Sequence, residues 1–245
     1  MALPVTALPY VDGRPVPLEL RGGLLVLAAC TLAFAALLWL PKAIPGNLGG
    51  WLGATAFVAL QMLGLLLVVG PAWMALFRRP RARDLLVAFA AVPLVIGVPA
   101  LVALGVVGED ALTANAAIGA AAGLPASQVV NLLAVSAVQL LGEELVTILP
   151  LLVLLSALHR AGLPAWLALG IAWVATSLAF GALHLPTYQW HFGQALLVIG
   201  SARLVLTGVY LLTRNIWAST VAHIANDWSI MLLTIFVAKA VSAAG

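Results

Sequence analysis

Long apolar runs divide this chain of 245 residues and leave it few ways to fold. Only 8% of its residues are charged and 64% are hydrophobic, whereas a soluble globular domain carries roughly 25% charged residues. Each run is long enough to cross the ~30 Å hydrocarbon core of a bilayer as a helix. A transmembrane β-barrel would instead show segments of about ten residues in which apolar and polar side chains alternate. We therefore expect an all-α, polytopic transmembrane bundle of about seven helices. The runs lie near 23–40, 52–77, 85–107, 127–156, 164–183, 194–213 and 215–238.

No internal repeat, low-complexity tract or linker divides the chain, so we expect a single membrane domain over residues 1–245. Within it we distinguish a Pro-rich cytoplasmic tail at 1–22, N-terminal transmembrane helices at 23–126 and a core at 127–238 that carries the polar residues of interest. The single cysteine, Cys30, excludes an intramolecular disulfide and any site with several cysteine ligands.

Positive charge is concentrated on one side of the expected bundle. If seven spans alternate, the arginines of the N-terminal tail and of the loops after the second, fourth and sixth runs all fall on that side. The opposite side holds only Lys42 and Lys239. By the positive-inside rule we expect an integral protein of a bacterial inner membrane with a cytoplasmic N-terminus. The net charge of +3 thus reflects topology, and we expect no nucleic-acid partner.

Two adjacent glutamates, Glu143 and Glu144, interrupt the fourth apolar run. Ionised carboxylates are costly in hydrocarbon, so acids in membrane helices usually face a cavity, a partner or a reaction. Gln139, Glu143 and Thr147 are spaced four residues apart and share one helix face, whereas Glu144 points about 100° away. Glu143 is therefore the member of the pair that belongs to a polar stripe.

Two later helices carry polar stripes of the same spacing. These are Thr176, Phe180 and His184 in the fifth run, and Ser219, His223 and Asp227 in the last, with Asn226 adjacent. Three such stripes can converge only inside the bundle. A desolvated glutamate can act as general base toward water, and neutral histidines with a nearby amide or acid can donate to an oxyanion. Alternatively, Glu143, His184 and His223 could hold a divalent metal such as zinc and leave one position open for water.

The segments Gly142–Leu145, Phe180–His184 and Trp217–Asp227 resemble successive motifs of the CPBP family, the CAAX-protease and bacteriocin-processing intramembrane endopeptidases. The family pattern is Glu-Glu-x-x-x-Arg, then Phe-x-x-x-His, then His-x-x-x-Asn/Asp, on separate membrane helices. The resemblance covers roughly residues 127–238, which would be the catalytic core. It implies a protease whose substrate is a membrane-anchored or lipid-modified protein or peptide.

The resemblance also implies roles for the matching positions. Glu143 would activate the attacking water with Glu144 as its helper, and Phe180 would be the aromatic partner of His184. The implied catalytic residues are Glu143, His184, His223 and Asp227, and the supporting residues are Glu144, Phe180 and Asn226. We favour a glutamate-type protease without a metal cofactor over a metallo-endopeptidase.

One position departs from the family pattern. The arginine expected four residues after the second glutamate is Ile148, which removes a counter-charge from the acid pair. Arg203 lies in the sixth run with no neighbouring acid in sequence, so we expect it to reach Glu144 or the substrate. His191 follows His184 within an aromatic-rich stretch and is a further supporting candidate at the substrate entrance.

Two functions of other classes remain open. Some relatives are associated with bacteriocin self-immunity, and a non-catalytic binding role would survive the loss of the arginine. A proton-coupled transporter could use the same acids and histidines as a relay, although the paired broken helices typical of such transporters are not evident.

Overall fold

The computed structural model describes residues 8–115, 119, 121 and 123–244, and over these residues it is all-helical. Within the described residues, seven helical segments are long and apolar enough to cross a membrane, which confirms the expected helix bundle. The long helices are α1 (Leu20–Ala43), α2 (Asn47–Val69), α3 (Ala82–Val102), α5 (Ala126–Arg160), α6 (Ala165–Leu183), α7 (Gly200–Thr213) and α8 (Ile216–Ala244). Short helical turns are η2 (Gly70–Ala75), η3 (Ala103–Val107), η4 (Glu109–Ala111) and η5 (Gly193–Ile199).

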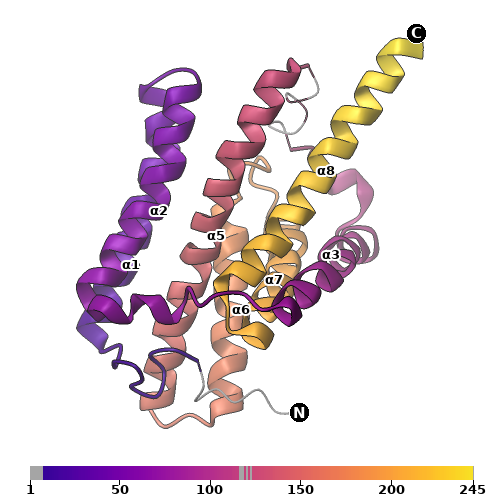
Figure 1. Ribbon diagram of the computed structural model, residues 1–245. Helices are drawn as coiled ribbons and strands as arrows, with labels where there is room; N and C mark the ends of the chain where they lie inside the picture. Colours follow the sequence, from indigo (N-terminus) through magenta and orange to yellow (C-terminus); the bar gives the residue numbers. More distant parts are fainter. Residues whose placement is uncertain (1–7, 116–118, 120, 122, 245) are drawn as a thin grey trace.

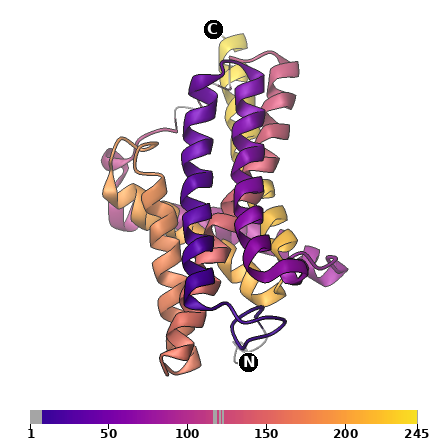
Figure 2. The same cartoon turned by 90° about the vertical axis from the view of Figure 1, so that its left-hand side faces the viewer.

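The helix α5 is the centre of the bundle and, at 35 residues, the longest helix in the part that the structure describes. The α1–α2 hairpin packs on one of its sides, and α6 and α8 pack against it as well. Figure 1 shows α5 and α8 lengthwise but α3 nearly end-on, so α3 crosses the bundle at a steep angle and packs on α7 and α8. Figure 2, turned by 90° about the vertical axis, shows α1 and α2 side by side.

A close contact between α2 and α5 fixes the height of the glutamate pair in the bundle. A Cβ on Gly142 would lie 2.4 Å from the Cδ1 of Phe57, so only glycine allows this approach. The side chain of Gln61 donates to the carbonyl of Gly142 at 3.0 Å and to that of Phe57 at 2.8 Å. Small residues and interhelical hydrogen bonds of this kind hold membrane helices together where no hydrophobic driving force exists.

The segment before α1 is packed against the bundle over residues 8–19. Tyr10 is 1% exposed, and its hydroxyl donates to the carbonyl of Ala72 at 2.9 Å. Ser156 on α5 donates to the carbonyl of Tyr10, and Arg160 donates to that of Leu18. The predicted N-terminal tail is therefore a packed segment here, while its first seven residues lie outside the described residues.

Candidate functional site

A cavity of about 660 Å³ lies where the three predicted polar stripes meet. It is bordered by residues of α3, α5, α6, η5, α7 and α8, and the loop before residue 116 contributes as well. Seven of the predicted site residues line it: Glu143, Phe180, His184, Arg203, His223, Asn226 and Asp227. The convergence expected from the spacing of these stripes is thus present.

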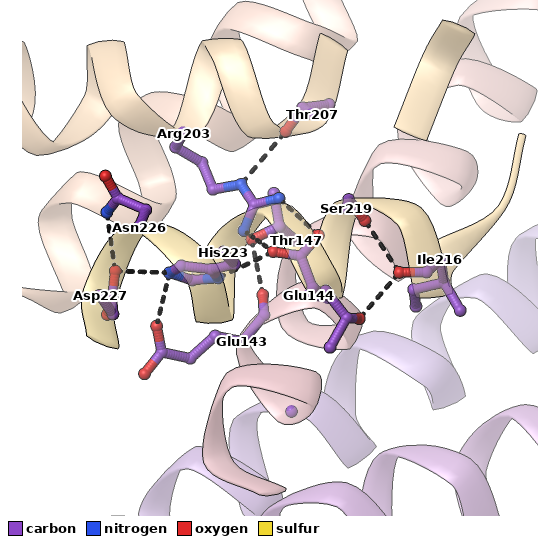
Figure 3. Close-up of polar contacts among 12 residues, drawn as sticks. Glu143, Glu144, Thr147, Arg203, Thr207, Ile216, Ser219, His223, Asn226 and Asp227 are labelled. Atoms are coloured by element: carbon purple, nitrogen blue, oxygen red, sulfur yellow. Dashed lines mark hydrogen bonds and ion pairs between the residues drawn. The ribbon is translucent and has the colours of Figure 1, made fainter. Parts of the chain in front are cut away.

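Glu143 presents its carboxylate to this cavity. Its side chain is 12% exposed, and Gln139, one turn earlier on α5, donates to Oε1 at 2.9 Å. Thr147, one turn later, donates to the backbone carbonyl of Glu143 at 3.0 Å. The second oxygen, Oε2, lies 3.8 Å from Nε2 of His223 (Figure 3). The predicted stripe is therefore a connected polar row whose central carboxylate faces the cavity.

Glu144 has a different environment, because its side chain is fully buried and fully paired. The guanidinium of Arg203 binds it through two hydrogen bonds, from Nη1 to Oε1 at 2.6 Å and from Nη2 to Oε2 at 2.8 Å. His223 adds a third contact through Nδ1 at 2.9 Å. Bidentate pairing of this kind offsets the desolvation cost of burying an ionised carboxylate. The predicted contact of Arg203 with Glu144 is confirmed.

Arg203 itself is 0% exposed and is held on three sides. Its Nε donates to Thr207 Oγ1 at 3.2 Å, and its Cζ lies 5.2 Å from the centre of the Phe180 ring. Ile148, where the family pattern has arginine, is 0% exposed and packs with Leu145 in the apolar core. The counter-charge of Glu144 therefore comes from α7 and not from α5.

His223 joins the two glutamates. Its Nδ1 faces the carboxylate of Glu144, which can only accept, so this nitrogen carries the proton. The other nitrogen, Nε2, is directed toward Glu143 and lies 3.7 Å from Oδ1 of Asp227 (Figure 3). The buried glutamate and its arginine therefore fix the orientation of the imidazole.

His184 lines the same cavity but belongs to a separate set of contacts. It caps the C-terminus of α6, and its Nδ1 lies 2.9 Å from the carbonyl oxygen of Phe180. A carbonyl only accepts, so the proton is on Nδ1 and the lone pair on Nε2 in the neutral ring. The ring centroid of Phe180 lies 4.7 Å from that of His184 and 6.4 Å from that of His223. Phe180 is therefore a neighbour of both histidines.

Asn226 and Asp227 form a pair at the edge of the cavity. Nδ2 of Asn226 donates to Oδ1 of Asp227 at 2.9 Å. The Asp227 side chain is 43% exposed, whereas Asn226 is 8% exposed and its Oδ1 has no hydrogen-bond partner among the described residues. This oxygen is therefore a buried acceptor without a hydrogen-bond partner among the described residues.

Tyr188 is a cavity residue that the sequence analysis did not single out. It is 9% exposed, lines the cavity and hydrogen-bonds to the side chain of Asn115. Burial raises the pKa of its phenol, so the hydroxyl stays protonated and can donate. The signal was present, because Tyr188 extends the spacing of four residues beyond His184.

His191 is not among the residues that line the cavity, and its place at the substrate entrance stays a prediction. It is exposed, and the chain turns before it, because Gln189 and Trp190 have φ values of 51° and 65°. These left-handed backbone conformations redirect the chain just after Tyr188.

A pair of reciprocal hydrogen bonds fastens the loop before residue 116 to the rim of the cavity. Thr113 N donates to Oε1 of Gln194 at 2.8 Å, and Nε2 of Gln194 donates to the carbonyl of Thr113 at 2.9 Å. Both residues line the cavity. The side-chain amide of Gln194 therefore pairs with both the backbone N–H and the backbone carbonyl of Thr113, as a second backbone segment would.

Glu143, His184 and His223, considered above as alternative metal ligands, all line the cavity. Within the described residues, no group of three or more His, Cys, Asp or Glu side chains is arranged to hold a metal ion. Glu143 and His223 are neighbours, but the Nδ1 of His184 is engaged with its own helix end.

Fold and cavity together define a polytopic helical membrane protein with a buried acid–histidine site. Residues 125–229, about two fifths of the chain, match the model of the family described as type II CAAX prenyl endopeptidase Rce1-like. The resemblance expected from the three motifs is thereby confirmed, and the matched segment contains all the site residues described above except Thr113 and Asn115. Neither a curated protein nor a solved structure matches the chain.

Proposed function

We propose that the protein is an intramembrane endopeptidase that cleaves near the C-terminus of a prenylated, membrane-anchored protein. One observation carries the proposal: of two adjacent glutamates, Glu144 is neutralised by Arg203, while Glu143 faces the cavity beside His223. The family match over residues 125–229 supports this function and this substrate class. The arginine distribution supports a bacterial inner membrane and a cytoplasmic N-terminus.

In the proposed reaction Glu143 is the general base. It takes a proton from a water molecule, whose oxygen attacks the carbonyl carbon of the scissile peptide bond. Glu144 cannot take this role, because both of its oxygens are bound by Arg203. Gln139 holds Oε1 of Glu143 and leaves Oε2 for the water. The proposed mechanism uses these side chains and no metal.

The histidines would complete the proton transfers. His223, donating through Nε2 in its doubly protonated form, would stabilise the oxyanion that develops on the carbonyl oxygen. His184, with its lone pair on Nε2, would orient the water and pass the proton from Glu143 to the leaving amine. The C–N bond then breaks, and the products are a carboxylate and an amine.

One wall of the cavity suits an apolar substrate segment. Val95, Ile96 and Pro99 on α3 line it, together with Val198, Ile199 and Leu206 from the η5–α7 segment. Glu143 on α5, and His223 and Asp227 on α8, supply polar side chains to the same cavity. An extended peptide could therefore place aliphatic side chains against α3 while its backbone faces Glu143.

The proposal is tested with purified protein in liposomes and a farnesylated peptide that ends in Cys-a-a-X, where a is aliphatic. We expect mass spectrometry to detect release of the C-terminal tripeptide. The same peptide without the farnesyl group is the control and should be cleaved much more slowly. Equal cleavage of both would contradict prenyl recognition, and no cleavage of either by folded protein would contradict the proposed substrate class.

Asp227 provides a second prediction for the same assay. Its carboxylate accepts from Asn226 and lies beside Nε2 of His223, so it would hold both groups at the oxyanion. We expect Asp227→Ala to lower kcat by about 10²-fold, the size typical of a lost oxyanion contact, and Asp227→Asn to retain more of the activity. Asp110→Ala, outside the cavity, is the control. Wild-type kcat in Asp227→Ala would remove this residue from the mechanism.

A further inference from the structure

A second cavity, of about 470 Å³, is a groove between α3, α6 and α7, which we call the α3–α7 groove. It shares no lining residue with the candidate active site. The side chains that line it are all apolar among the described residues: Val87, Ala90, Ala91, Leu94, Trp173, Leu204, Val205, Gly208, Val209 and Leu212. Ala90, Leu94 and Leu212 are exposed, so the groove opens on the membrane-facing surface.

The floor of this groove is held in shape by Trp173 and Gly208. The indole Nε1 donates to the carbonyl of Leu204 at 3.0 Å, which fixes the ring across the α6–α7 contact. A Cβ on Gly208 would lie 3.2 Å from Cζ2 of Trp173, so a side chain here would crowd the floor. These two contacts shape the floor of the groove where α6 packs on α7.

One end of the groove is positively charged. Arg83 lies four residues before Val87 and so on the same face of α3, and Arg214 follows Leu212 by two residues. The guanidinium of Arg78 donates to the carbonyls of residues 213 and 214, and Asn215 Nδ2 donates to Asp84 at 3.3 Å. The start of α3 and the end of α7 are therefore joined, which places both arginines at the same end.

Neither Arg83 nor Arg214 takes part in any ion pair within the part of the chain that the structure describes. Arg83 is exposed and Arg214 is partly exposed. Two cations thus stand beside an apolar groove with no protein carboxylate to bind them. This combination is complementary to a molecule that has an alkyl chain and an anionic head.

We propose that the α3–α7 groove binds an anionic phospholipid, with one acyl chain along the groove and the phosphate at Arg83 and Arg214. Lipid is the solvent around these spans, and basic residues near a bilayer surface attract anionic headgroups. The prenyl chain of a substrate is the competing occupant. It carries no phosphate and would leave the two arginines without a partner, so the charged end favours the phospholipid.

The test measures retention of palmitoyl-oleoyl phosphatidylglycerol by the purified full-length protein, using native mass spectrometry from detergent. Phosphatidylcholine with the same chains is the headgroup control. Two variants probe the site: Arg83→Gln with Arg214→Gln removes the charged end, and Ala90→Leu fills the groove from an exposed position. Their matched controls are Arg21→Gln and Ala28→Leu, both at exposed positions of α1.

We expect phosphatidylglycerol to bind more tightly than phosphatidylcholine, and the double arginine variant to weaken phosphatidylglycerol binding about 25-fold, which is about fivefold for each arginine. Ala90→Leu should weaken both lipids, and the α1 controls should bind as the wild type does. Equal binding of the two lipids, or binding that neither the arginine variant nor Ala90→Leu changes, would overturn the proposal. Displacement by a farnesylated peptide in the wild type but not in Ala90→Leu would assign the groove to the prenyl chain instead.

Discussion

Glu143→Gln is expected to lower the rate of peptide hydrolysis by about 10²- to 10⁴-fold, the range that a general base contributes. Glutamine has nearly the same shape but cannot take a proton from water. Its side-chain oxygen can still accept the hydrogen bond that Gln139 donates at 2.9 Å, so the local packing is preserved. The rate is measured as release of the C-terminal tripeptide from the farnesylated reporter.

The glutamine variant also separates catalysis from binding. The variant should unfold at the wild-type temperature and should still bind the uncleaved reporter, because the cavity is unchanged in size. Hydrolysis at the wild-type rate would disprove the role of Glu143. A cellular immunity effect that persists in this variant would favour the non-catalytic binding function, and uptake driven by a pH gradient in proteoliposomes would favour the transporter.

Arg203→Leu is expected to lower the free energy of unfolding by about 3–5 kcal/mol, the cost of leaving a buried charge unpaired. Both oxygens of Glu144 would lose their guanidinium partner at a position with 0% exposure. The unfolding midpoint in detergent measures this effect. Arg203→Lys is the matched control, because lysine keeps the positive charge but cannot form the bidentate hydrogen bond to Glu144.

The double variant Glu144→Leu with Arg203→Leu distinguishes stability from positioning. Replacing both members of a buried ion pair by apolar residues is often neutral or stabilising, so stability should return toward the wild-type value. Hydrolysis should not return, because His223 loses the acceptor for its Nδ1. Recovery of activity together with stability would show that the pair only supports the fold.

Much of the candidate site was predictable because helical spacing is strict. Residues four apart on α5 and on α8 had to share a face, and the cavity lies where those faces meet. Arg203 was predictable on energetic grounds, since a lone cation in an apolar run needs a buried acid. The bundle of seven apolar spans followed from the length of the runs.

Other features depend on tertiary contacts that carry no periodic signal. Tyr188 enters the cavity because two left-handed residues turn the chain just after it, and an aromatic residue in this stretch is equally typical of a membrane interface. The packing of residues 8–19 depends on single contacts such as that of Tyr10 with Ala72. Prolines in this segment suppress any regular pattern from which the contact could be predicted.

The position of the counter-charge has a consequence for the biogenesis of the protein. In a family member with arginine four residues after the glutamate pair, the acids and their positive counter-charge lie on the same helix when that helix leaves the ribosome. In this chain the arginine that binds Glu144 follows 59 residues later, on α7. The glutamates of α5 therefore enter the membrane-insertion machinery before their arginine has been synthesised. We expect α5 to insert stably into the bilayer only after α7 has been synthesised.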